Sequence, residues 1–416
     1  MQEVNGFAAF LTKSKRFDIE YALIPMKYRA WKGFSIRKTG NVTVGLCLTN
    51  RDNYENSAIH GEFYNHEKDY PEIDHLTTFL TSSDGSYSLI MPFSDEIIFA
   101  RDALGTKPLY YALQDGDVGI ASDARVLDKV GFRNIDTAEP GVLCKATLNS
   151  FEKTPFNPIT YSTQACGIDE AIENVTKLLS ESVQRRVANK KVMLGFSGGI
   201  DSALLAHLAS KNNKITLVTA CTEDSLDYKF SSKAADMLGM QLTTLTINEK
   251  QVKNSVHAIQ KVAHLKGLMQ MSIACVVHIL ARYARENNFD ALMLGQLADE
   301  LFGGYARYLK FLKQSEEKVI NALFKDIKNA HTDNFYRDEL ASAPYTKLLL
   351  PYASLDLVKY AVTLPVNLKL NHRTGGRKIV LREVAKALGL PDELVNREKK
   401  AMQFSSGVFK IVSKMN

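Results

Sequence analysis

The sequence contains few of the features expected of a secreted, membrane-spanning or zinc-binding protein. Only 5 of its 416 residues are cysteine, and none of them form a Cys-x-x-Cys pair, which argues against a disulfide framework or a zinc ribbon. No run of about 18 uninterrupted apolar residues occurs, because Gln270, Ser272 and His278 interrupt the most apolar stretch. The N-terminal residues lack the basic start and the apolar core of a signal peptide. We therefore expect a cytoplasmic protein that does not insert into a membrane.

The excess of charge of one sign is also small. The chain has 52 basic and 46 acidic residues and a formal net charge of +6, so the charge balance gives no argument for nucleic-acid binding. Internal repeats and low-complexity tracts are absent from the sequence as well. Hydrophobic residues make up 45% of the chain, an ordinary share for a globular protein, and the length suits two or three domains of roughly 100–200 residues.

The first 150 residues, roughly, have the pattern of a mostly β domain. Short strand-like runs alternate with turn signals such as Ser83–Gly85 and Asp115–Gly116. Strands are expected at residues 42–48, 58–64, 86–91, 96–100, 109–113 and 142–147, and a helix near 72–80. This pattern predicts an antiparallel two-sheet domain over residues 1–153, followed by a Pro-, Asn-, Ser- and Thr-rich linker over 154–167.

The apolar period changes to a helical one at residue 168, and helices and strands then alternate. Strands are expected at 192–196, 215–221, 242–247 and 291–294, and helices at 168–187, 228–238 and 272–287. After Tyr305 the pattern is largely helical. Strands that alternate with helices indicate a parallel sheet covered on both faces, so residues 168–416 are predicted to form an α/β domain.

A glycine turn between a buried strand and a helix carries the strongest chemical signal. It reads Ser-Gly-Gly-Ile-Asp-Ser, and its glycines let the backbone approach a phosphate while the helix N-terminus offers free N–H groups. A carboxylate beside phosphates is repulsive unless a cation lies between them, so Asp201 is predicted to be a magnesium ligand. No Gly-Lys-Ser/Thr ends the turn, so it is not a Walker loop. The predicted nucleotide-binding residues of this turn are Ser197, Gly198, Gly199, Asp201 and Ser202.

A second acidic loop follows the strand expected at 291–294. It spans Leu294–Tyr305 and carries Asp299 and Glu300. In doubly wound sheets ligands bind at the carboxyl ends of the strands, and the loops of Asp201 and Asp299 both leave such ends. The two carboxylates can therefore reach one metal ion on one nucleotide.

These motifs resemble those of a known family. Residues 197–202 resemble the pyrophosphate loop of the ATP pyrophosphatase superfamily. Ala298–Tyr305 resembles the second signature of the class B asparagine synthetases and of their relatives, the β-lactam synthetases and lasso-peptide cyclases. Further stretches resemble the same family in the same order, at residues 59–66, 101–111, 140–141, 350–365 and 397–407. The resemblance covers nearly the whole chain.

The resemblance implies an α+β N-terminal-nucleophile-type αββα sandwich, followed by an α/β parallel-sheet ATP pyrophosphatase domain with a helical C-terminal part. It implies ATP and Mg²⁺ as cofactors, with Asp201 and Asp299 on the metal. It also implies catalytic roles for Asp299, Glu300 and Lys399, of which Lys399 would face the α-phosphate or the leaving pyrophosphate.

Three more residues complete the nucleotide site that the resemblance implies. Leu194 and Gly295 stand at the ends of the two strands that precede the loops. Lys378, in the stretch Lys-Ile-Val-Leu-Arg, is a second lysine candidate, although a lysine on a helix surface is an equal alternative.

The chain also departs from the family pattern. Asn5 and Gly6 align with the Cys-Gly start of the family's glutaminase, and removal of Met1 would expose only Gln2. His60 replaces an amide-bearing Asn, and the arginine that grips the glutamine carboxylate is missing around residues 46–48, although Glu62 and Asp84 remain. We therefore expect the first domain to be a degenerate glutaminase-like domain, either a structural relic or a binding module.

The synthetase part departs from the family pattern too. Gln296 and Ala298 stand where the family motif has Glu and Ser, in the part that selects the acid and the amine. We therefore expect an AMP-forming ligase that joins a small-molecule carboxylate, aspartate or another acid, to ammonia or an amine, without glutaminase activity. A tRNA-modifying ATP pyrophosphatase and a non-catalytic scaffold remain as alternatives, and a second copy of the chain is a candidate partner.

Overall fold

The computed structural model describes residues 2–13, 17–49, 57–65, 73–211, 213–263, 265, 267–397 and 405–415. The chain folds into two compact units. Unit 1 comprises Met1–Ile159 and His331–Glu339, and unit 2 comprises Thr160–Ala330 and Leu340–Asn416. The segment 331–339 thus belongs to unit 1, although the residues on both sides of it in the sequence belong to unit 2.

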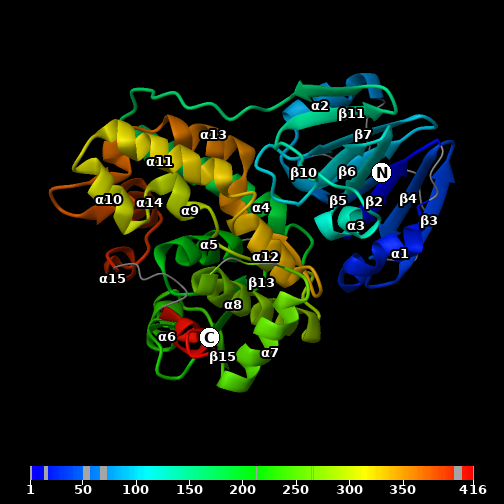
Figure 1. Cartoon of the computed structure of the whole chain (residues 1–416). Coiled ribbons are helices and arrows are strands. Elements are labelled where there is room, and N and C mark those ends of the chain that lie inside the picture. The colour runs from blue at the N-terminus through cyan, green and yellow to red at the C-terminus, as the bar shows by residue number, and fades with distance from the viewer. Residues whose placement is uncertain are drawn as a thin grey trace. The chain divides into compact units, whose positions relative to one another are not determined.

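Unit 1 contains two six-stranded sheets (Figure 1). The first sheet has the order β1 (Gln2–Val4), β5 (Ala58–Phe63), β6 (Gly85–Pro92), β7 (Glu96–Arg101), β11 (Val142–Thr147) and β12 (Phe151–Pro155). The second has the order β10 (Asp136–Thr137), β8 (Tyr110–Gln114), β9 (Asp117–Ala121), β2 (Phe7–Leu11), β4 (Val42–Cys47) and β3 (Phe34–Thr39). One pair departs from the antiparallel pairing that we expected, because β1 and β5 run parallel.

Three hydrophobic clusters divide unit 1 into layers. The largest lies between the sheets, where Phe7 and Ile120 of one sheet pack with Phe99 of the other. A second cluster joins the outer face of the β2 sheet to the helices α1 (Ile19–Leu23) and α3 (Ala124–Lys129). A third joins the outer face of the β6 sheet to α2 (Leu76–Ser82). Because side chains alternate between the faces of a strand, each sheet supplies both a central and an outer layer.

Unit 2 is built around a five-stranded sheet in which every pair is parallel. Its order is β15 (Leu242–Thr246), β14 (Ile215–Cys221), β13 (Val192–Gly195), β16 (Ala291–Met293) and β17 (Lys347–Leu349). The strand order reverses between β13 and β16, which are neighbours in the sheet. In open parallel sheets such a switch point leaves a crevice at the carboxyl ends of the strands, where ligands bind.

Helices cover this sheet and form most of the rest of unit 2 (Figure 1). Those of the first part are α4 (Ile168–Val187), α5 (Ile200–Ser210), α6 (Leu226–Met237), α7 (Glu249–Gln260), α8 (Gly267–Glu286) and α9 (Ala298–Phe302). The later ones are α10 (Ala306–Leu312), α11 (Glu316–Asn329), α13 (Leu355–Thr363), α14 (Ile379–Ala387), α15 (Asp392–Val395) and α17 (Val408–Val412), with the hairpin β18 (Leu370–Asn371) and β19 (Gly376–Arg377). Helix α12 (Asn334–Ser342) begins in unit 1 and ends in unit 2.

Helix α8 is the one helix of the described residues that is long and apolar enough to cross a membrane by length and composition. It begins at Gly267, five residues before the start that we expected at Ser272. In its most apolar window 61% is buried inside the structure, and its neighbours are β14, β16, α7 and α17. The core helix of a globular unit has the same character, so the length and hydropathy of α8 are weak evidence for a membrane span.

Most of the elements expected from the sequence are present, and two of the strands that we did not expect, β2 and β17, lack a readable pattern for different reasons. Every residue of β2 is buried, so its sequence Phe-Ala-Ala-Phe-Leu shows no alternation of polar and apolar residues. The edge strand β17 has only three residues, too few to show a period. Residues 157–167 contain neither helix nor strand, and our domain boundaries stay a prediction.

Candidate active site

The glycine turn between β13 and α5 forms the first wall of the candidate site. Gly198 has a φ of +66°, and a Cβ atom there would lie 2.9 Å from the backbone oxygen of Phe230, so only glycine fits without strain. Helix α5 begins directly after Gly199. The Ser202 hydroxyl donates to the Gly199 carbonyl (3.0 Å) and lies 3.4 Å from the Ser197 hydroxyl. These contacts hold the turn in one shape at the carboxyl end of β13.

The second wall is the loop that follows β16. Leu297 caps α9 with a φ of +76°, a left-handed conformation that is costly for a residue with a branched side chain. Gly304 ends the loop, and a Cβ atom there would collide with Oδ1 of Asp299 and with Cε of Lys378. The backbone is therefore folded tightly around the Asp299 side chain.

Lys378 joins the two walls. Its ammonium lies 2.5 Å from both carboxylate oxygens of Asp201 and 2.6 Å from Oδ1 of Asp299. The Lys378 side chain is only 2% exposed, whereas the two aspartates are each 15% exposed. Lys378 itself has a φ of +58°, so a second non-glycine residue in the left-handed region lies at the site. The structure excludes the alternative that Lys378 is a lysine on a helix surface.

The local electrostatics agree with this convergence. Burial, followed by the negative charges of Asp201 and Asp299, raises the pKa of Tyr352 well above its usual value. The Tyr352 hydroxyl donates to the backbone carbonyl of Asp201 at 3.1 Å. Both carboxylates also contact the ammonium of Lys378, so the residues 201 and 299 lie on the same side of the sheet end.

The other predicted residues are placed as follows. Leu194 is buried in β13 and pairs with Leu217 and Met293, so its side chain belongs to the core. Gly295 faces Asp201, and a Cβ atom added to that glycine would lie 3.3 Å from the Cβ of Asp201. Glu300 is buried and accepts a hydrogen bond from the Tyr305 hydroxyl (2.6 Å). Lys399 lies outside the described residues.

Arg397, the first residue of the family-like stretch 397–407, is a residue of the site for which we predicted no role from the sequence. Its Nη1 donates to the backbone carbonyl of Ser197 (3.1 Å), and its guanidinium lies 4.3 Å from the ring centre of Phe230. Arg382 of α14 donates to the carbonyl of Arg397 (3.2 Å) and so holds this segment. In the sequence, Arg397 is marked only by its place two residues before Lys399. Its contact with the turn 197–202 is visible only in the fold.

The pair of aspartates also fits a magnesium ion. Their oxygens already converge on one cation, the ammonium of Lys378. Mg²⁺ is usually held by one or two carboxylates together with water and the phosphates of a nucleotide, rather than by a full set of protein ligands. Within the described ranges, no group of three or more His, Cys, Asp or Glu that could hold a metal occurs.

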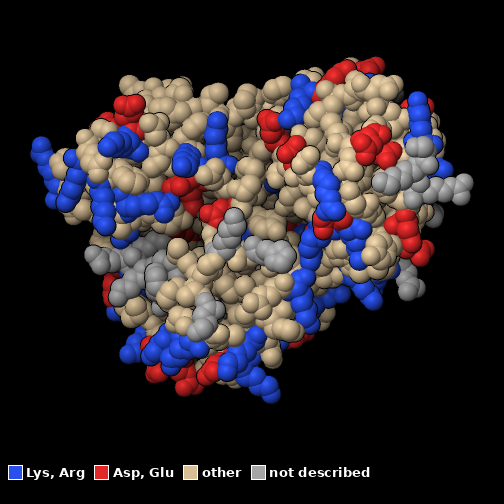
Figure 2. Space-filling view, in the orientation of Figure 1, with Lys and Arg blue, Asp and Glu red and all other residues tan. Residues whose placement is uncertain are grey.

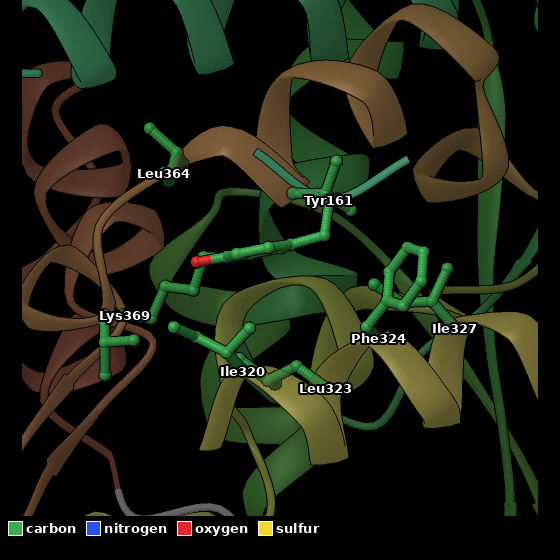
Figure 3. Close-up of a pocket in the computed structure, with 9 residues that line it drawn as sticks. Tyr161, Ile320, Leu323, Phe324, Ile327, Leu364 and Lys369 are labelled. Atoms are coloured by element: carbon green, nitrogen blue, oxygen red, sulfur yellow. The ribbon is translucent and has the colours of Figure 1, made fainter. Parts of the chain in front are cut away.

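A different cavity of unit 2 contains a second buried lysine, Lys369 (Figure 3). Within the part of the chain that the structure describes, its ammonium has no carboxylate partner, and burial alone lowers its pKa to about 7. Figure 3 shows the ring of Tyr161 lying across this cavity. The remaining lining residues are apolar: Ile320, Leu323, Phe324, Ile327, Val362, Leu364 and Val366.

Unit 1 contains the residues that we compared with the glutaminase site of the family. Asn5 is buried, and its amide donates to the backbone carbonyl of Arg29 (2.9 Å). Cys47 is fully buried in β4, and burial raises the pKa of its thiol to about 12, so at neutral pH it is not a thiolate. His60 lies 3.1 Å from Oε1 of Glu339, in a cluster of buried charged side chains.

The surface charge bears on the nucleic-acid alternative. Figure 2 shows Lys and Arg side chains gathered over the part of unit 2 that carries α10 and α11. These helices also carry Glu316, Glu317 and Asp326, and Asp326 forms an ion pair with Arg307 at 2.6 Å. Acidic residues within the same helices weaken the field that a phosphate backbone requires.

Comparisons with known proteins agree with these motifs. Residues 174–347 and 312–411 match the family described as "Asparagine synthase", and residues 57–129 match "Glutamine amidotransferase domain". The chain is 28% identical to the "Putative asparagine synthetase (glutamine-hydrolyzing) 1" of Methanocaldococcus jannaschii, over 81% of this chain and 72% of that protein. It is 24% identical to the "Asparagine synthetase (glutamine-hydrolyzing) 1" of Lotus japonicus, over 87% of this chain and 67% of that protein.

Solved structures resemble the chain only distantly. The NMN synthetase from Francisella tularensis matches with a TM-score of 0.32 and 14% identity, over 60% of this chain and 87% of that one. The glutamine PRPP amidotransferase from B. subtilis matches with a TM-score of 0.34 and 13% identity, over 76% of this chain and 92% of that one. Scores this low carry no argument about the fold or the site.

Proposed function

The chain belongs to the asparagine synthase family, and from this premise we propose that it is an ATP-dependent ligase that forms amide bonds. It activates a small-molecule carboxylate as an acyl-adenylate and then transfers the acyl group to ammonia or to another amine. The observation that carries this proposal is the convergence of Asp201 and Asp299, from the loops of two neighbouring strands, on the ammonium of Lys378.

The first step needs a site for a triphosphate. The turn 197–202 supports this role, because its glycines expose backbone N–H groups at the start of α5. A carboxylate oxygen of the substrate attacks the α-phosphorus of ATP, the bond to the β-phosphate oxygen breaks, and pyrophosphate leaves. A magnesium ion held by Asp201 and Asp299 would neutralise charge on the phosphates. Lys378 and Arg397 bring further positive charge to the place where negative charge develops.

The second step forms the amide. The amine nitrogen attacks the carbonyl carbon of the acyl-adenylate, AMP leaves, and the nitrogen loses a proton. Glu300 is the acid of the second loop that lies beside Tyr305, and we propose that it contacts the acyl substrate or the amine. Lys399 remains a proposed catalytic residue by the family pattern.

We propose that the nitrogen does not come from glutamine hydrolysis by this chain. Asn5 occupies the position of the family's nucleophilic cysteine, and Cys47 is buried as a neutral thiol. Free ammonia, or an amine on a second substrate, therefore supplies the nitrogen.

The test is exchange of labelled pyrophosphate into ATP across a panel of carboxylic acids that includes aspartate. We expect exchange with one class of acid and AMP as the nucleotide product in the presence of an amine. ADP as the product, or no exchange with any acid together with no binding of ATP by calorimetry, would contradict the proposal.

A pair of glycine variants links this activity to the site. Gly304→Ala places a methyl group against Asp299 and Lys378, so exchange should be lost. Gly167→Ala is the matched control in unit 2, because nothing lies within 4 Å of a Cβ atom there, and it should exchange like the wild type. Equal exchange by both variants would place the chemistry elsewhere.

A further inference from the structure

Unit 1 encloses one carboxylate between basic side chains from three distant parts of the chain. We propose that Arg29, Lys107 and His60 form a carboxylate-binding pocket, and that the side chain of Glu339 is its built-in ligand. The proposal concerns unit 1 alone and does not depend on the synthetase chemistry above.

The contacts of Glu339 are those of a bound small carboxylate. Oε1 accepts a hydrogen bond from Nη1 of Arg29 (2.9 Å) and lies 3.1 Å from Nε2 of His60, and Oε2 accepts from Nζ of Lys107 (2.7 Å). Each oxygen therefore has a charged donor of its own. The side chains are between 0% and 7% exposed, so water competes little for these bonds.

The pocket is built by other parts of unit 1, and not by Glu339. The side-chain amide of Asn5 donates a hydrogen bond to the backbone carbonyl of Arg29 (2.9 Å). In return, Nη1 of Arg29 donates to the backbone carbonyl of Asn5 (3.2 Å). Asp102 accepts hydrogen bonds from the backbone N–H and the hydroxyl of Thr106, which fixes the turn before Lys107. The basic side chains are thus held independently of the residue that fills the space between them.

The charges of the basic side chains favour an anion at this place. Burial lowers the pKa of His60 to about 4, so it is neutral at pH 7 and can supply an Nε2–H donor without adding charge. Arg29 and Lys107 remain as two buried cations around the single carboxylate. Within the described ranges, Nη2 of Arg29 has no hydrogen-bond partner, so the pocket retains unused donor capacity.

Glu339 also explains why the segment 331–339 belongs to unit 1. Residues before and after this segment fold into unit 2, and the occupied pocket anchors its last residue. A tethered carboxylate binds without the loss of translational freedom that a free acid suffers, because its effective concentration is high. A free carboxylate of similar shape should therefore bind only after the tethered one is removed.

Chemical rescue tests this proposal on the full-length chain. Glu339→Ala removes a group with the shape of acetate, and it should lower the thermal midpoint by on the order of 10 °C. Sodium acetate should then raise the midpoint saturably above that in sodium chloride of equal ionic strength. The wild type and Glu139→Ala, in which an exposed glutamate of unit 1 is removed, should show no difference between the two salts. Equal effects of acetate and chloride on Glu339→Ala would overturn the proposal.

A second pair of variants decides the case if Glu339→Ala does not fold in chloride. Refolding of that variant in acetate would support the pocket. If it folds in neither salt, Glu339→Gln and Lys107→Met are compared with the double variant. We expect the double variant to be more stable than the sum of the single losses predicts, because removing both partners leaves fewer unpaired buried charges. Strict additivity would overturn the proposal.

Discussion

The two units contain buried charge clusters of opposite design. In unit 2 one ammonium, that of Lys378, lies between two carboxylates, whereas in unit 1 one carboxylate, that of Glu339, lies between a guanidinium and an ammonium. The aspartates of unit 2 are 15% exposed at the carboxyl ends of strands, but Glu339 is only 4% exposed. A ligand from solution can approach the partly exposed aspartates of the first cluster, whereas the second cluster is enclosed.

The difference teaches that a buried charge is not by itself a sign of function. A charge at the carboxyl ends of parallel strands, with backbone strain at Leu297 and Lys378 beside it, has the character of a site where ligands bind. A charge enclosed on all sides stabilises one arrangement of the chain. Variants in the two clusters should therefore affect different measurements.

The largest effect is expected at the open cluster. Asp299→Asn should lower ATP–pyrophosphate exchange by about a hundredfold to a thousandfold. The reason is that the proposed magnesium ion, which neutralises the charge on the phosphates, loses one of its two carboxylate ligands. The midpoint of thermal unfolding should move less than in Glu339→Gln, since both oxygens of Asp201 still contact Lys378. Asp356→Asn is the matched control, with a side chain that is 57% exposed. Normal ATP–pyrophosphate exchange by Asp299→Asn would show that Asp299 has no role in the reaction.

The enclosed cluster should instead respond in stability. Glu339→Gln keeps the shape of the side chain but leaves Arg29 and Lys107 without their anion, so the free energy of unfolding should fall by about 3–5 kcal/mol. Denaturant titration at pH 7 measures this loss. A change smaller than that of an exposed variant such as Glu139→Gln would show that the cluster contributes nothing to stability.

The enclosed cluster also predicts a dependence on pH. Burial alone would raise the pKa of Glu339, but Lys107, His60 and Arg29 outweigh it and hold that pKa well below the usual range. The stability from Glu339 is therefore present above the pKa of an unfolded glutamate, about 4.3, and is lost as the pH falls through the lower pKa of the folded state. Wild type and Glu339→Gln should converge in stability at acidic pH, and parallel curves would contradict the assignment.

The buried Lys369 has no carboxylate partner among the described residues. Removal of its charge should therefore raise the stability of the chain, whereas removal of the Glu339 charge should lower it. The folded-state pKa of Lys369 is about 7, below that of an unfolded lysine at about 10.4, so its burial is unfavourable below pH 7 and this cost fades as the pH rises between the two values. Lys369→Met should stabilise the chain at pH 7 by on the order of 2–4 kcal/mol and remove the rise in stability at alkaline pH. Lys386→Met, on the exposed side of α14, is the control. Destabilisation by Lys369→Met at pH 7 would contradict this account.

The smallest effect is expected for Asn5→Cys, although the family pattern would suggest that this variant gains glutaminase activity. Asn5→Cys restores a thiol at the position of the nucleophile, but His60 and Arg29 beside it remain engaged with Glu339. Groups that act as a unit are not restored one at a time, so this variant and the wild type should both release no glutamate above background. The assay uses ATP and excess glutamine, and steady release by the wild type would make glutamine a nitrogen donor for this chain.

Much of unit 2 could be predicted from the sequence, because its signals are local. The strand β14 was predicted with the bounds that it has, Ile215–Cys221, and the turn 197–202 follows a strand and opens a helix as expected. Apolar periodicity and turn chemistry depend on neighbouring residues alone, so they can be read without the fold. A parallel sheet was expected as well, but the adjacency of β13 and β16 was not readable in this way, since strand order depends on contacts between distant residues.

By itself, the sequence determined which loops carry the acids and which departures from the family pattern occur. The tertiary structure decided which charges meet: Lys378 is 177 residues from Asp201, and Glu339 is 310 residues from Arg29. No local pattern marks such partners, because a buried charge needs a counter-charge at a few ångströms and any distant segment that the topology brings there can supply it. The same physics therefore placed a buried ammonium between two carboxylates in unit 2 and a buried carboxylate between two basic side chains in unit 1.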